Sequence, residues 1–136
     1  MDALTFFRTI PSASSPMLAA MDDIVKLAKE MKWNDDAVFA LRMGLDEAIS
    51  NAIRHGNKSN PDKQVEIEVA FAGRSAHIRI LDQGEGFDPA KVPDPRQPEN
   101  LDRPGGRGLL LIRAYMKKVD WNPKGNQIQL HMELPE

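Results

Sequence analysis

Glu47 and Asn51 are the first residues of the chain whose types and spacing could do chemistry together. Residues four apart on a helix are separated by only about 40° around its axis, so both side chains point the same way. On the same projection Ala40 and Gly44 lie beside them and form a stripe of small residues. We interpret this stripe as one wall of a cleft, and the alternative is a solvated polar face of a helix.

Asp82 is the second candidate. Side chains alternate along a strand, so Asp82 continues the face of Ile78 and Ile80, which should be the buried one. An unpaired buried charge costs several kcal/mol, so the carboxylate needs a donor from the backbone, water or a ligand such as the exocyclic amine of adenine. Gly84 and Gly86 follow and leave room for a flat ring. The alternative is a turn in which the glycines supply positive φ.

A glycine-rich segment forms the third candidate. Gly105, Gly106 and Gly108 run directly into a predicted helix, whose unpaired amides and positive dipole end bind phosphate oxygens. Arg107 could add a charge-assisted bond. No Lys-Ser or Lys-Thr follows the last glycine, so this is not a Walker loop. A flexible hinge is the alternative.

The three histidines are weaker candidates. His55 stands where a helix should end, and Gly56 after it indicates a structural stop. His77 and His131 lie in strand patterns and form no ligand-spaced cluster with each other. The chain has no cysteine, which excludes disulfides, thiolate metal sites and a cysteine nucleophile.

The elements that must position these candidates follow from periodicity. Strands are predicted over 4–10 and 128–134. Two further strands, over 65–71 and 77–80, are predicted to form an antiparallel hairpin that turns near 72–74. Helices are predicted from a serine cap before Pro16 to about Lys32, from 34–36 to 55–56, and over 109–118. The proline-rich stretch 87–104 between them is typical of a lid or a binding loop. We therefore expect an α+β fold, a two-layer sandwich of a mixed, mostly antiparallel sheet with helices on one face.

Length and charge limit the number of domains and the classes of function that the chain can have. The 136 residues suit one domain, 1–136. A net charge of -2 gives no field that would attract nucleic acid or an anionic membrane, so we expect neither as a direct partner. The amino terminus lacks the pattern of a secretion signal and no apolar run is long enough to cross a bilayer, so the cytoplasm is the expected compartment.

In combination and order, the three segments resemble the adenine-pocket motifs of the GHKL ATPase superfamily. Residues 45–56 are similar to its N box, 81–87 to its D-x-G-x-G-F box and 105–111 to its last glycine box. The N box that ends in His-Gly, and the sequence Gly-Gly-Arg-Gly-Leu-Leu-Leu-Ile-Arg, resemble most closely the anti-sigma-factor serine-protein kinases of the RsbW and SpoIIAB type.

The resemblance implies a role for each candidate. Glu47 would be the general base, Asn51 would bind Mg²⁺ and Asp82 would bind the adenine amine. The cofactors would then be ATP and Mg²⁺. The remaining cofactor-binding residues would be the glycines that floor the base pocket and the segment that meets the phosphates: Gly84, Gly86, Gly105, Gly106, Arg107, Gly108 and Leu109. Pro104 stands where some relatives carry a basic residue, which leaves open whether Arg103 or Arg107 assists phosphoryl transfer.

The implied function is an ATP-dependent serine/threonine protein kinase. It would phosphorylate an anti-anti-sigma (STAS-like) protein and sequester a sigma factor or another regulator, and a homodimer is a further expectation. One alternative is a non-catalytic module that uses ATP to shape an interaction surface. A sensor histidine kinase catalytic domain is disfavoured, because the chain has no room for the helical hairpin that carries a phosphoacceptor histidine.

Overall fold

The computed structural model describes residues 3–85 and 113–134. In chain order, its elements are β1 (Ala3–Pro11), α1 (Ser14–Glu30), α2 (Asp35–Asn51), the π-helical turn η1 (Ala52–Gly56), β2 (Gln64–Ala72), β3 (Ser75–Leu81), β4 (Met116–Trp121) and β5 (Gln127–Glu133). None of the helices within these two ranges is long and apolar enough to cross a membrane.

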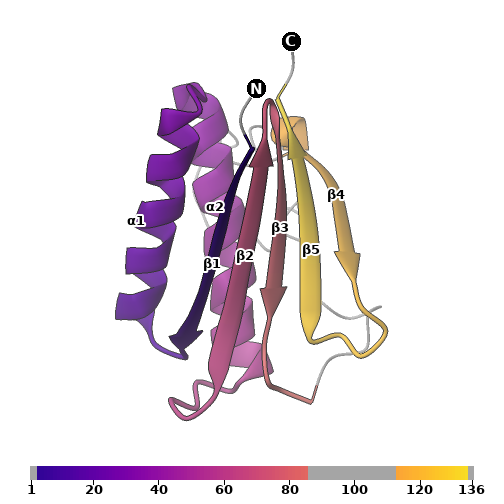
Figure 1. The fold of residues 1–136 in the computed structure, drawn as a ribbon. Helices are drawn as coiled ribbons and strands as arrows, with labels where there is room; N and C mark the ends of the chain where they lie inside the picture. Colours follow the sequence, from indigo (N-terminus) through magenta and orange to yellow (C-terminus); the bar gives the residue numbers. More distant parts are fainter. Residues whose placement is uncertain (1–2, 86–112, 135–136) are drawn as a thin grey trace, which may run out of the picture.

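The strands form one sheet in the order β1-β2-β3-β5-β4, and each of its neighbouring pairs is antiparallel. Helix α1 packs on α2 and β1, and α2 packs on β5, so the two helices cover the same face of the sheet (Figure 1). The α+β class and the two-layer arrangement are confirmed. The predicted hairpin is confirmed as β2 and β3, with Gly73 in its turn at a φ of 59°.

The core lies between this sheet face and the helices, as the periodicity of each element predicts. On β2 every second residue from Val65 to Phe71 is buried, and β5 buries Ile128, Leu130 and Met132 in the same way. The helices contribute the matching apolar stripe, which includes Met21, Ile24, Leu41, Leu45 and Ile49. Burial of this surface holds the helices on the sheet.

The helix caps differ from each other. The Asn34 side chain accepts a hydrogen bond from the Ala37 amide at 2.8 Å, so the predicted cap of α2 is confirmed. The serine cap expected for α1 is wrong. Its N-cap is Ala13, which has no side-chain acceptor, because Ser12 is buried and donates its hydroxyl to the Lys63 carbonyl instead.

The third helix was predicted too long. Residues 113–115 are helical, but strand β4 begins at Met116 and pairs with β5 as the edge of the sheet. Only Met116 of β4 is fully buried, so the strand shows little of the alternation that marks a strand in a sequence. Pairing with β5, and not a local sequence pattern, makes this segment a strand.

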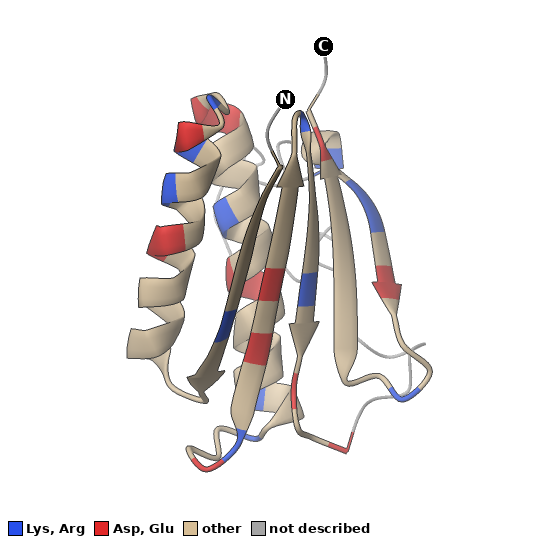
Figure 2. Ribbon diagram, viewed as in Figure 1, with Lys and Arg blue, Asp and Glu red and all other residues tan. Residues whose placement is uncertain are grey.

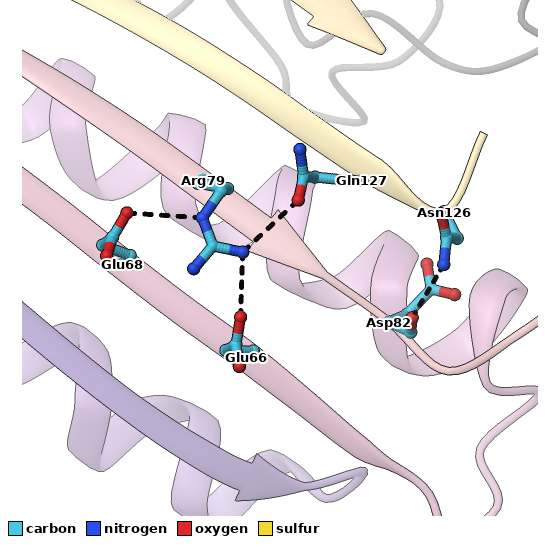
Figure 3. A network of polar contacts seen from close by, with 6 residues as sticks. All are labelled: Glu66, Glu68, Arg79, Asp82, Asn126 and Gln127. Atoms are coloured by element: carbon cyan, nitrogen blue, oxygen red, sulfur yellow. Dashed lines mark hydrogen bonds and ion pairs between the residues drawn. The ribbon is translucent and has the colours of Figure 1, made fainter. Parts of the chain in front are cut away.

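The open face of the sheet carries a charge cluster. Figure 2 shows two acidic bands on β2 beside a basic band on β3. The Arg79 guanidinium lies 2.8 Å from a Glu66 carboxylate oxygen and 3.3 Å from one of Glu68, and it also donates to the Gln127 side chain (Figure 3). These contacts join β2, β3 and β5 on the face opposite the helices.

Candidate functional site

Asp82 leaves the end of β3 on the face that the helices cover. It is 4% exposed, and Ile78 and Ile80 before it are also buried, which confirms the alternation inferred from the sequence. Its carboxylate accepts a hydrogen bond from the Gly84 amide at 2.8 Å. Its main chain is held by Asn126, which accepts from the Asp82 amide at 2.9 Å and whose side chain donates to the Asp82 carbonyl at 3.3 Å (Figure 3). The backbone of Asp82 is therefore fixed by the β4–β5 turn.

Two glycines allow the Asp82 loop to lie against the end of the helix. A Cβ atom at Gly56 would overlap the Asp82 carboxylate, and one at Gly84 would overlap the Gly56 carbonyl. Neither glycine has a positive φ. They are required for close approach of the two segments, and the interpretation of Gly84 as the source of a positive φ in a turn is wrong.

The helical segment ends at Gly56, as predicted, but Gly56 does not have the left-handed conformation of a glycine stop. The chain passes from α2 through η1 to Gly56, and the left-handed conformations come later, at Lys58 (φ 53°) and Ser59 (φ 57°). Single π turns inside helices often occur at functional sites. Here the turn places Gly56 directly against Asp82.

Burial sets the protonation behaviour of Asp82. Desolvation raises the pKa of its carboxyl group, and the Gly84 amide and the positive charges of Lys124 and Lys63 partly offset this. Within residues 3–85 and 113–134, the Gly84 amide is the hydrogen-bond donor to the carboxylate. A desolvated carboxylate is an acceptor that suits a ligand that presents an N–H group, such as the adenine amine.

Asn51 and Glu47 lie on the helix that leads into this turn. Asn51 is the last residue of α2 and is 8% exposed. Glu47 is partly buried one turn earlier. A side-chain amide oxygen is a ligand that suits a hard cation that brings its own waters. Within the same ranges, no group of three His, Cys, Asp or Glu side chains could hold a metal by itself.

The stripe of small residues is not open along its whole length. Ala40 is fully buried, and a Cβ atom at Gly44 would meet the Met116 side-chain methyl at 2.6 Å and that of Leu130 at 3.9 Å. The interpretation of this stripe as a cleft wall is therefore wrong at Gly44, where core side chains from β4 and β5 fill the space.

Asn57 is a buried polar residue that the sequence did not single out. It is 1% exposed, donates to the Ser12 hydroxyl and the Gln64 carbonyl, both at 2.9 Å, and accepts from the Gln83 amide at 2.8 Å. Asn126 was missed in the same way. Only the positions of the two asparagines in the sequence could have indicated their roles. Asn57 directly follows the His-Gly pair, and Asn126 directly follows Gly125.

Several expected site residues lie outside the described residues. They are Gly86, Gly105, Gly106, Arg107, Gly108 and Leu109, together with the proline-rich stretch 87–104. The structure therefore brings Asp82 and Gly84 against the end of the helix that carries Glu47 and Asn51, and the roles expected for the phosphate-binding segment stay predictions.

His77 and His131, which show no metal-ligand spacing in the sequence, are direct partners across β3 and β5. Their ring centroids are 6.3 Å apart at 90°. His77 also contacts the Gln129 side-chain oxygen at 2.9 Å, which places the pair on the open face, away from Asp82. The pair could be recognised only once the strand register was known.

Comparison with known proteins agrees with this geometry. The serine-protein kinase RsbW of Oceanobacillus iheyensis is 31% identical over 102 residues, which cover 71% of this chain and 65% of that protein. The anti-sigma F factor of Anoxybacillus flavithermus is 30% identical over 96 residues, covering 68% of this chain and 64% of that protein. The chain thus spans slightly less than two thirds of the length of these relatives. A family model described as the histidine kinase-like ATPase domain matches residues 10–132, and the chain belongs to this family.

Proposed function

We propose that this chain binds ATP with Mg²⁺ and transfers the γ-phosphoryl group to a serine or threonine of an anti-anti-sigma (STAS-like) protein. In the same proposal it sequesters a sigma factor or another regulator. Support comes from membership of the ATPase family and from relatives named serine-protein kinase and anti-sigma F factor. The order of the motifs within residues 1–136, taken as one domain, agrees with this.

The observation that carries the proposal is the buried Asp82 carboxylate at the end of the helix with Glu47 and Asn51. In the proposed complex, Asp82 accepts a hydrogen bond from the adenine amine beside Gly84 and Gly86. Mg²⁺ supplies charge neutralisation at the phosphates when bound, and the Asn51 side-chain oxygen is its protein ligand. Gly105, Gly106, Arg107, Gly108 and Leu109 hold the phosphates.

Glu47 acts as the general base in this proposal. Its carboxylate accepts the proton of the substrate hydroxyl as that oxygen attacks the γ-phosphorus, and ADP leaves. A positioned base of this kind typically contributes about 10² to 10⁴ in rate. The side chain therefore matters for transfer more than for nucleotide affinity.

The test is phosphoryl transfer from labelled ATP, with Mg²⁺, to a cognate antagonist protein. Glu47→Ala should lower the transfer rate by about 10²-fold or more while most nucleotide binding remains. Asp46→Ala is the matched control, because it removes the neighbouring acid, whose carboxylate accepts from Ser50 at 3.0 Å along the helix. Equal rates for wild type and Glu47→Ala would remove Glu47 from its role. Antagonist binding that responds to ATP without any phosphoprotein would favour a non-catalytic module, and acid-labile phosphate would indicate a histidine acceptor.

A further inference from the structure

Asn57 connects the proposed adenine site to the rest of the fold. Two short segments run side by side here. In the first pair, Gly56 lies against Asp82. In the second pair, one residue further along each segment, the Asn57 side chain accepts a hydrogen bond from the Gln83 amide at 2.8 Å. The Gly56 carbonyl also lies directly against Gly84. The loop that carries the carboxylate is therefore aligned residue by residue with the end of the helix.

The donor side of the Asn57 amide is anchored in the sheet. Its nitrogen donates to the Ser12 hydroxyl after β1 and to the Gln64 carbonyl at the start of β2. Ser12 in turn donates to the Lys63 carbonyl at 2.7 Å. At 1% exposure, these bonds are shielded from water, so their geometry is strongly constrained.

We propose that Asn57 is a positioning residue for base recognition: by holding the Gln83 amide, it keeps the Asp82 carboxylate at the height and angle that an adenine amine requires. The inference rests on the proposed function, because it needs an adenine nucleotide at Asp82. It extends that function by assigning adenine selectivity to a residue that does not touch the nucleotide.

The test compares binding of ATP with binding of purine riboside triphosphate, which lacks only the exocyclic amine, in the presence of Mg²⁺. Wild type should prefer ATP. In Asn57→Ala, affinity for ATP should fall about tenfold, the loss expected for one hydrogen bond to a charged group, while affinity for the amine-free nucleotide stays unchanged. The selectivity ratio therefore collapses even though the phosphate and metal contacts are intact.

Ser12→Ala is the matched control. It removes an Asn57 partner in the same buried network but leaves the Asn57–Gln83 bond, so it should reduce stability and preserve selectivity. Should Asn57→Ala not fold, Asn57→Ser makes the same test with a smaller loss of buried volume, because it too lacks the amide oxygen that accepts from the Gln83 amide.

The outcomes distinguish failure of the positioning role of Asn57 from failure of the proposed adenine site at Asp82. An equal loss of affinity for both nucleotides in Asn57→Ala, or unchanged selectivity, overturns the positioning role and leaves the proposed function standing. A wild-type protein that binds neither nucleotide, or that shows no preference for ATP, overturns the adenine site itself and the inference with it.

Discussion

The Asp82 carboxylate lies so close to Gly56 that no other residue could occupy position 56 without displacing it. Asp82 directly follows β3, the middle strand of the sheet, and Gly56 ends the helical segment that carries Glu47 and Asn51. The contact therefore joins the acceptor proposed for the base to the residues proposed for catalysis and metal binding.

Gly56→Ala should destabilise the protein by about 1–3 kcal/mol, because the new methyl group overlaps a carboxylate that its neighbours hold in place. Gly44→Ala is the matched control: its new methyl group would crowd the flexible end of Met116 and make an ordinary contact with Leu130, and alanine is the better helix former by about 1 kcal/mol. Urea denaturation measures both. Equal effects at the two positions would contradict the account of Gly56, and Gly56→Ala should cost less when Asp82→Ala is also present.

Asp82→Asn should stabilise the nucleotide-free protein at neutral pH. Because burial raises the pKa of Asp82 in the folded state, folding takes up protons, and stability falls as pH rises from the ordinary carboxyl value of 3.8 through the raised folded value. The uncharged side-chain amide in Asp82→Asn does not titrate, so the variant does not lose stability in this way as pH rises. The stability gap between variant and wild type should therefore be present at pH 7 and close below about pH 4. Parallel stability curves over this range would show that Asp82 is not desolvated.

Arg79→Met should lower stability by about 1 kcal/mol, and the loss should shrink in high salt. The Arg79 side chain is 23% exposed and joins Glu66, Glu68 and Gln127 across three strands. Lys118→Met is the control, because Lys118 and Asp120 form a single pair that is 69% and 57% exposed, and its loss should be near zero. Thermal unfolding at two salt concentrations distinguishes them, and equal losses would mean that the Arg79 cluster acts as ordinary surface charge.

The two helix starts predict opposite effects. Asn34→Ala removes the acceptor of the Ala37 amide and should cost about 1 kcal/mol. Ala13→Ser adds an acceptor where α1 has none, at an exposed residue with extended backbone (φ -146°), and should stabilise by about 0.5–1 kcal/mol. The free energy of unfolding of each variant checks this. An unchanged free energy of unfolding in Ala13→Ser would mean that water already accepts the hydrogen bonds of the free amides in the first turn of α1.

Local patterns were sufficient for much of the fold. Apolar periodicity located both helices, the hairpin and β5, and alternation alone placed Asp82 on the covered face. Strand β4 could not be found this way, since it is an edge strand with one fully buried residue, Met116, and pairs with a segment that follows it.

What the sequence could not supply was contact between distant segments. Gly44 reads as open space on a helix, but Met116 reaches it from 72 positions along the chain, as the numbering shows. The reason for Gly56 lies at Asp82, and the partners of Asn57 are spread over three segments. In the sequence such residues show only a local role, as a helix or turn residue, and their contacts with distant segments become visible only in the fold.

Titration calorimetry of ATP with Mg²⁺ present tests the central claim most directly. Wild type and Arg79→Met, altered on the opposite face of the sheet, should take up ATP with equal affinity, and Asp82→Ala should lose about tenfold or more. No uptake of adenine nucleotide by the wild type, or equal affinity in Asp82→Ala, would contradict the assignment of Asp82 as the residue that recognises the base.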